Sequence, residues 1–224
     1  MAQDIKSYAS VPQGGQSQVD FILLDSSGSM ESKWWDSLTA IDVYVKTLRE
    51  QNVNSQMMLT VFSESTELSL ERDCPISDWR DFMTDPVGGF WGSTALYDAI
   101  NAMGRTMRDL NPPRAAITIV TDGEENASQW TNHTQAKAIL DWARAKGWQV
   151  TFIGAEFNNA KQAELLGSNP AAAIGVSQQY LTDAAKELAR KRARYAIDGA
   201  PMHFTDEERQ QFGGYLSAPE SEVK

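Results

Sequence analysis

The chain has 224 residues, 42% of them hydrophobic, and a formal net charge of −10. Its length is within the reach of one α/β core, and its negative charge opposes binding to nucleic acids or anionic membranes through a general electrostatic field. The single cysteine, Cys74, excludes an internal disulfide.

Residues 1–18 are polar and rich in glycine, serine and glutamine, which predicts a flexible segment. They lack the apolar core of a secretory signal. The chain also has no apolar run of membrane length. These features favour a cytoplasmic protein that has neither nucleic acid nor a membrane as its partner.

The first predicted strand ends abruptly at polar residues. Residues 21–24 form a short, continuous apolar run, typical of a strand buried on both faces. Asp25, Ser27 and Ser29 follow directly. In open α/β sheets, ligands bind beyond the carboxyl ends of the strands. The three side chains therefore form a candidate cradle for a divalent cation, although the same residue types also cap helices and form turns.

Helical and strand patterns alternate after this loop. Apolar residues at three- and four-residue intervals from Trp34 to Leu48 predict an amphipathic helix. Residues 56–62 predict a second strand and residues 66–70 a short third one. The tight connection between these strands predicts an antiparallel edge.

A second helix is predicted after Thr94 and ends at Asn111, where two prolines follow. Residues 117–120 then form a second buried-strand pattern, which leads to Asp122. Thr94 and Asp122 thus place two more oxygen atoms at turns between predicted elements. They are the next candidates for cation ligands.

The alternation continues with a helix over residues 134–145, strands over 149–153 and 172–176, a helix over 160–166 and a long helix from Tyr180. This is the order of a doubly wound α/β fold. The last helix carries a basic cluster, for which we favour a solvated helix end over a nucleic-acid patch, with a docked protein as a further alternative. The cluster comprises Lys186, Arg190, Lys191, Arg192 and Arg194.

Residues 198–224 form a C-terminal extension to the domain predicted over residues 19–197. Thr205 and Glu208 have the spacing of a capping box, which predicts a short helix to about Phe212. We expect its apolar side chains to pack back on the domain, with docking on another copy or a larger assembly as the alternative. These side chains are Phe204, Phe212, Tyr215 and Leu216. The final residues are expected to be mobile.

Three segments together resemble the von Willebrand factor type A (VWA) family. They read Asp-Ser-Ser-Gly-Ser-Met from Asp25, Gly-Ser-Thr-Ala-Leu-Tyr-Asp-Ala-Ile from Gly92 and Thr-Asp-Gly-Glu-Glu-Asn from Thr121. They are most similar to the stand-alone bacterial and bacteriophage members. The resemblance implies an intact metal-ion-dependent adhesion site (MIDAS), with the ligands Asp25, Ser27, Ser29, Thr94 and Asp122.

The resemblance also implies the architecture: a Rossmann-like three-layer sandwich with a mostly parallel six-stranded sheet and one antiparallel edge strand. The strand before Asp25 and the strand before Asp122 would be neighbours at its centre. Oxygen ligands of this kind suit Mg²⁺, with Mn²⁺ or Ca²⁺ as substitutes. By resemblance, a carboxylate of a protein partner completes the coordination. Because few of the ligands are charged, the bound ion still attracts an anion.

The expected function is therefore a non-catalytic, cation-dependent protein-protein interaction module. One alternative is a structural component of a homo-oligomer, a phage particle or another assembly, which associates through its aromatic loops and C-terminal extension while the metal only rigidifies the loops. If phage-encoded, it would be a component of the virion. Another is an adaptor for an AAA-type ATPase. Catalysis is disfavoured because His133 and His203 lie outside the three segments and no paired Cys or His motif suggests zinc.

Aromatic residues near the three segments are candidates for a partner-binding rim. They are Trp34, Trp35, Phe90, Trp91 and Trp130, with Glu31 and Glu124 beside them. Trp91 is the best candidate because the glycine-rich sequence around it leaves no helix to pack. Burial beside the loops is the alternative for the aromatic side chains. The acids, including Glu125, are expected to be solvated, or else to tune metal affinity.

Overall fold

A six-stranded sheet in the order β3-β2-β1-β4-β5-β6 forms the middle of the protein. The computed structural model describes residues 18–64, 68–154 and 158–213. Five strands are parallel and β3 runs antiparallel to β2 at the edge, which confirms the predicted architecture. The strands are β1 (Gln18–Asp25), β2 (Gln56–Phe62), β3 (Leu68–Pro75), β4 (Arg114–Val120), β5 (Gln149–Gly154) and β6 (Ala173–Gly175).

The edge strand β3 extends further than its sequence predicts. We expected residues 66–70, of which 66 and 67 lie outside the described part, but pairing with β2 continues to Pro75. The added stretch contains Glu71, Arg72 and Asp73. Three consecutive charged residues do not form the apolar pattern from which a strand is predicted. An edge strand accommodates such residues because much of it stays in contact with water.

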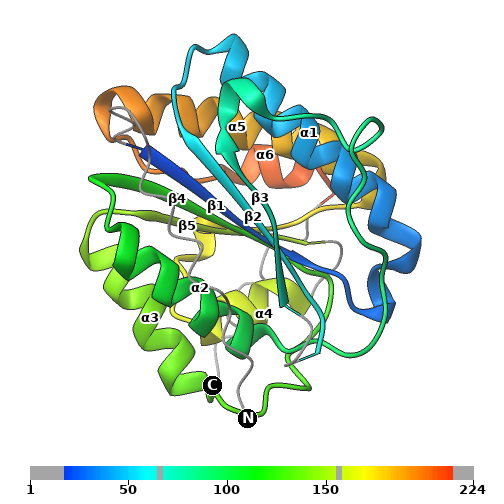
Figure 1. The fold of residues 1–224 in the computed structure, drawn as a ribbon. Helices are drawn as coiled ribbons and strands as arrows, with labels where there is room; N and C mark the ends of the chain where they lie inside the picture. Colours follow the sequence, from blue (N-terminus) through cyan, green and yellow to red (C-terminus); the bar gives the residue numbers. More distant parts are fainter. Residues whose placement is uncertain (1–17, 65–67, 155–157, 214–224) are drawn as a thin grey trace, which may run out of the picture.

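Helices cover both faces of the sheet, as Figure 1 shows. One layer contains α1 (Trp34–Glu50), α5 (Leu181–Asp198) and the short α6 (Asp206–Gln211). The other contains α2 (Leu96–Leu110), α3 (His133–Ala145) and α4 (Asn158–Leu165). The fold is therefore a doubly wound three-layer sandwich. Among the described residues, no helix is both long enough and apolar enough to cross a membrane.

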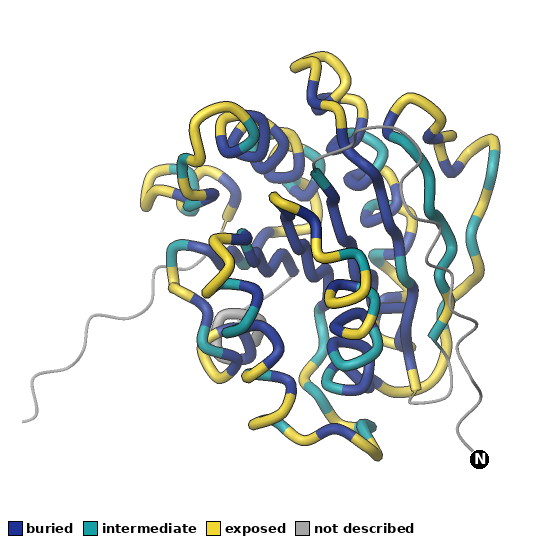
Figure 2. Tube along the Cα trace, turned by 60° about the vertical axis from the view of Figure 1, so that its left-hand side comes forward, coloured by how far each residue is buried: buried dark blue, intermediate teal, exposed yellow. Residues whose placement is uncertain are grey.

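Strand β1 divides its side chains between two cores. Ile22 and Leu24 pack toward the α1 and α5 layer, whereas Phe21 and Leu23 belong to the core beneath α2 and α3. This alternation follows from the two-residue period of a strand. Figure 2 shows the result: buried strands fill the middle of the molecule, and exposed segments lie along its outside.

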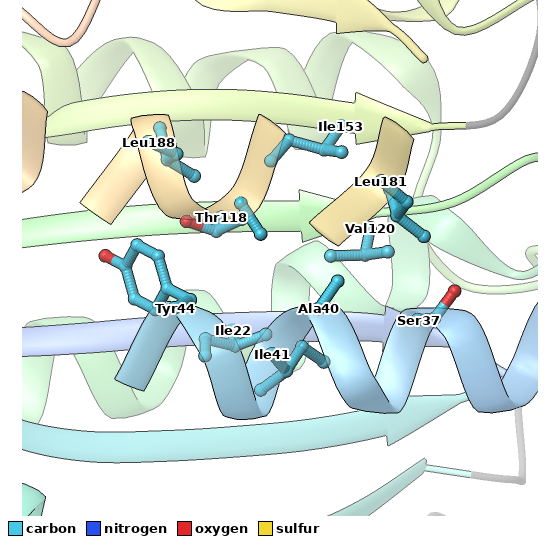
Figure 3. A pocket seen from close by; sticks show the side chains of 11 residues that line it. Ile22, Ser37, Ala40, Ile41, Tyr44, Thr118, Val120, Ile153, Leu181 and Leu188 are labelled. Carbon is cyan, nitrogen blue, oxygen red and sulfur yellow. The ribbon is translucent and has the colours of Figure 1, made fainter. Parts of the chain in front are cut away.

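Helices α1 and α5 leave a small apolar gap above the sheet (Figure 3). Its lining includes Ala40 and Ile41 from α1, Leu181 and Leu188 from α5, and Ile22 from β1. The cavity volume is about 20 Å³, far below the roughly 300 Å³ at which ligand pockets begin. We therefore interpret it as a packing gap.

The basic cluster of α5 is partly buried, which corrects the expectation of a solvated face. Arg192 is fully buried and donates to both carboxylate oxygens of Asp20 in β1, at 2.8 and 2.9 Å. Tyr44 and Ser55 donate to the same carboxylate, and burial raises the pKa of Tyr44, which keeps its hydroxyl protonated. A buried charge needs such partners, and the α5 sequence does not show that Asp20 lies beneath it.

The described part of the C-terminal extension packs on the domain. Phe204 and Phe212 are buried in the core on the α1 and α5 side. Thr205 and Glu208 form the predicted capping box of α6, and Glu208 also pairs with Lys191 of α5 at 2.7 Å. Tyr215 and Leu216 lie outside the described residues, as do the final residues expected to be mobile and, except for Gln18, the N-terminal segment predicted to be flexible.

We expect Arg192→Met to lower the free energy of unfolding by about 3–5 kcal/mol, because it leaves the buried Asp20 carboxylate without its guanidinium partner. Urea unfolding measures this change. The double variant Asp20→Asn/Arg192→Met should recover much of the loss. Arg190→Met, which breaks an exposed pair with Glu187, should cost less than about 1 kcal/mol. Equal effects of the two single variants would contradict this account.

Candidate functional site

The first loop of the site begins at Asp25, the last residue of β1. Asp25 is fully buried, and its Oδ1 accepts a hydrogen bond of 2.8 Å from the Ser27 backbone N–H. The hydroxyls of Ser27 and Ser29 lie 3.2 Å apart, and Ser29 donates to Oδ1 of Asp122 at 2.7 Å. Four of the five predicted ligands are therefore linked directly through this loop.

Asp25 and Asp122 meet because β1 and β4 are parallel neighbours. Thr121, between β4 and Asp122, donates its hydroxyl to Oδ2 of Asp25 at 2.6 Å. Burial raises the pKa of Asp25 to about 6, with a smaller contribution from the charge of Asp122, while the hydrogen bonds from Thr121 and Ser27 oppose the shift. The site thus holds a buried carboxyl group whose ionised form would be stabilised by a positive charge.

The second loop is fastened to the first by backbone hydrogen bonds. The Trp91 N–H donates to the Ser26 carbonyl at 2.8 Å, and the Gly28 N–H donates to the Gly92 carbonyl at 3.0 Å. Gly92 has a φ of +75°, a left-handed conformation that favours glycine. These contacts bring Thr94, which is buried, beside the first loop.

The third loop is fastened to the second through Thr94 and the start of α2. The Asn126 side chain accepts from the Thr94 N–H at 2.9 Å, and the Asn126 N–H donates to the Thr94 carbonyl at 3.0 Å. Glu125 accepts from the backbone N–H groups of Tyr97 and Ser128. Glu125 therefore connects the third loop to the start of α2. This corrects the expectation of a solvated acid.

Asp98 in the first turn of α2 completes this connection. Its carboxylate accepts from the backbone N–H groups of Gln129 and Trp130 at 2.8 and 3.2 Å. Together with Glu125 it ties the far end of the third loop to the helix that follows Thr94. These hydrogen bonds, with those of Asn126, thus hold the third loop against Thr94 and the start of α2.

The three loops converge around Gly123. A Cβ atom added there would lie 2.8 Å from Oγ1 of Thr94, 3.6 Å from Oγ of Ser29 and 3.7 Å from Oδ2 of Asp25. One point in the third segment is thus close to oxygen atoms of both the first and the second segment. The absence of a side chain at Gly123 leaves that space to the oxygen atoms.

The donor set at this point is oxygen-rich and contains only two carboxylates. Within the described ranges, no group of three His, Cys, Asp or Glu side chains could hold a metal ion. A cation at this site would therefore depend on the neutral hydroxyls of Ser27, Ser29 and Thr94. Hard cations such as Mg²⁺ accept this donor chemistry, so the residues fit the ion that the sequence predicts.

The predicted rim divides into exposed and buried members. Trp35, Trp91 and Trp130 are 59%, 50% and 60% exposed, and the two acids Glu31 and Glu124 are also exposed. Trp34 is buried in the core of the α1 side and packs edge-on against the half-buried Phe90. Trp34 is therefore no rim residue, because the helical phase of α1 turns it inward and Trp35 outward.

One charged neighbour of the site, Lys33, could not be predicted from the sequence. Lys33 lies at the end of the short 3-10 helix Gly28–Lys33 and forms an ion pair with Oδ2 of Asp122 at 2.6 Å. Its position three residues before Asp36 gives no sign of this contact. The two histidines have other surroundings: the His133 ring contacts the Leu165 carbonyl, and burial together with the nearby positive charges of Arg209 and Lys191 lowers the pKa of His203.

The raised pKa of Asp25 predicts a pH dependence of stability in the absence of divalent cations. The folded protein holds this proton up to about pH 6, whereas the ordinary value is 3.8. Stability from this group is therefore lost as the pH rises through that window, by roughly 3 kcal/mol. Asp25→Asn has no such titration. Urea unfolding in EDTA should show the variant gaining on the wild type between about pH 4 and pH 7, and a constant difference would contradict this.

Comparison with known proteins relates the fold to solved structures. No protein-family model and no curated protein matches the sequence. A von Willebrand factor type A structure from Catenulispora acidiphila is 13% identical with a TM-score of 0.61, over 80% of this chain and 43% of that chain. The vWF domain of the type V pili tip protein Mfa5 from Porphyromonas gingivalis is 11% identical with a TM-score of 0.63, over 87% and 100% of the chains.

The PilB minor pilin from Streptococcus sanguinis is also similar, with 14% identity and a TM-score of 0.55 over 82% of this chain and 63% of that chain. The chain thus spans less than two thirds of the Catenulispora and Streptococcus structures. At these identities the similarity concerns the fold alone. The chain has the fold of von Willebrand factor type A domains.

Proposed function

We propose that the protein is a divalent-cation-dependent, non-catalytic protein-protein interaction module. The cation, Mg²⁺ in our proposal and replaceable by Mn²⁺ or Ca²⁺, is held by the hydroxyls of Ser27, Ser29 and Thr94 with the carboxylates of Asp25 and Asp122. When bound, it supplies an electrophilic centre that attracts a carboxylate of a protein partner. The convergence of the three loops around Gly123 is the observation that carries this proposal.

The electrostatics of the site support an anionic partner. Its ligand set contains two carboxylates, and Oδ2 of Asp122 already accepts from the Lys33 ammonium. The local charge with a divalent cation would therefore stay positive, which favours an incoming carboxylate. The exposed Glu31 and Glu124 nearby would discourage a partner with dispersed negative charge and so favour a single acidic side chain in a neutral setting.

The exposed tryptophans support a protein partner. Trp35, Trp91 and Trp130 each expose half or more of their surface, and in the sequence each lies shortly before or after one of the segments that build the site. Exposed tryptophan is enriched at protein interfaces because its ring combines a large apolar area with a polar N–H. A minor pilin and a pilus tip protein are among the proteins of similar fold, which agrees with a role in protein assembly.

The Gly123→Ala variant tests the metal site. Its methyl group would enter the space between Thr94, Ser29 and Asp25, so we expect Mg²⁺ affinity measured by calorimetry to fall by at least about tenfold. Gly88→Ala is the matched control, since a Cβ there has nothing within 4 Å. Neither glycine has a positive φ, so both variants should fold, which circular dichroism checks.

The same variants test the interaction. Proteins captured from the native host should be retained in Mg²⁺ by the wild type and by Gly88→Ala, and lost both in EDTA and with Gly123→Ala. The same proteins in all four conditions would contradict a metal-dependent grip and support the structural alternative, in which a cation only rigidifies the loops. Unchanged Mg²⁺ affinity of Gly123→Ala would remove the proposed ligand set.

A further inference from the structure

Lys33, which is not one of the proposed metal ligands, forms an ion pair with the proposed ligand Asp122. Its ammonium lies 2.6 Å from Oδ2 of Asp122, across 89 positions of the chain. The Asp122 side chain is only 2% exposed and that of Lys33 is 16% exposed. The pair is thus well shielded from water, where a charge-charge interaction is stronger than on an open surface.

The surroundings of Lys33 hold it in place. Lys33 directly precedes α1, and it lines a small gap together with Met30, Ser37 and Leu181. Gln178, just before α5, donates to the Ser32 carbonyl at 2.9 Å, which fastens the neighbouring backbone to the start of α5. The ammonium is therefore directed at Asp122 by the packing of two helices rather than by a flexible surface position.

The two oxygens of Asp122 have different partners. Oδ1 accepts from Ser29, which belongs to the proposed ligand set, whereas Oδ2 accepts from Lys33. Lys33 thus binds Oδ2, the oxygen that does not contact the proposed ligand Ser29, and this contact fixes the orientation of the carboxylate. It also places a positive charge next to a carboxylate whose repulsion contributes to the raised pKa of Asp25.

We infer that Lys33 is a built-in counter-ion and positioning residue of the site, which stabilises the metal-free protein and weakens the binding of a divalent cation. This inference rests on the proposed function. In the metal-free protein, Lys33 offsets the charge of Asp122. When a divalent cation is bound, the Lys33 ammonium repels the cation. The Asp122 carboxylate, which also pairs with Lys33, then donates less charge to the cation. The ion then remains more attractive to a partner's carboxylate.

Three variants test the inference: Lys33→Met, Lys33→Arg and the control Lys137→Met, which removes a half-exposed lysine paired with Asp141. In EDTA, Lys33→Met should lower the Tm by about 2–8 °C. Its Mg²⁺ affinity in calorimetry should rise about tenfold, as expected when a shielded like charge is removed. Lys33→Arg should resemble the wild type, and Lys137→Met should change neither quantity.

A merely structural lysine would lower the Tm without tightening Mg²⁺ binding. Unchanged or weaker Mg²⁺ binding by Lys33→Met, with normal binding by the wild type, would therefore overturn the inference and leave the proposed function intact. Absence of Mg²⁺ binding in both proteins would overturn the proposed function. In that case the Tm of Lys33→Met in EDTA decides the counter-ion role: an unchanged Tm excludes it.

Discussion

The cost of burying negative charge at both ends of β1 constrains the structure. Asp20, near the start of the strand, and Asp25, at its end, are both inaccessible to solvent. A buried carboxylate must be paired or protonated. At Asp20 the protein provides the guanidinium of Arg192 from α5. This pair fixes the last long helix across the sheet and needs nothing from outside the chain.

At Asp25 the compensation is weaker. The Thr121 hydroxyl and the Ser27 backbone N–H donate hydrogen bonds to the Asp25 carboxyl group. The ammonium of Lys33 pairs with the neighbouring Asp122 instead. These contacts leave the pKa of Asp25 at about 6. Near the start of β1, the charge of Asp20 is therefore fully paired. At the end of β1, the site around Asp25 can accept a further positive charge. This difference places the structural task of β1 at its start and the proposed binding task at its end.

Much of the fold could be predicted from the sequence because its signals are local. Apolar periodicity predicted the helices and the buried strands, and the family resemblance of the three polar segments implied that β1 and β4 are neighbours. The contacts that were missed are made over long distances in the chain. Nothing near Arg192, Glu125 or Lys33 shows that the partners are Asp20, the α2 backbone and Asp122. Trp34 and Trp35 were indistinguishable because adjacent residues differ only in helical phase, which packing decides.

The proposed function depends on a divalent cation that binds where the three loops meet at Gly123. A crystal structure with Mn²⁺, recorded with anomalous scattering, would locate this cation. We expect one strong anomalous peak within direct coordination distance of the hydroxyl oxygens of Ser27 and Ser29, with Thr94, Asp25 and Asp122 as direct ligands or one water away. A peak elsewhere, or none at this position at saturating Mn²⁺, would contradict it.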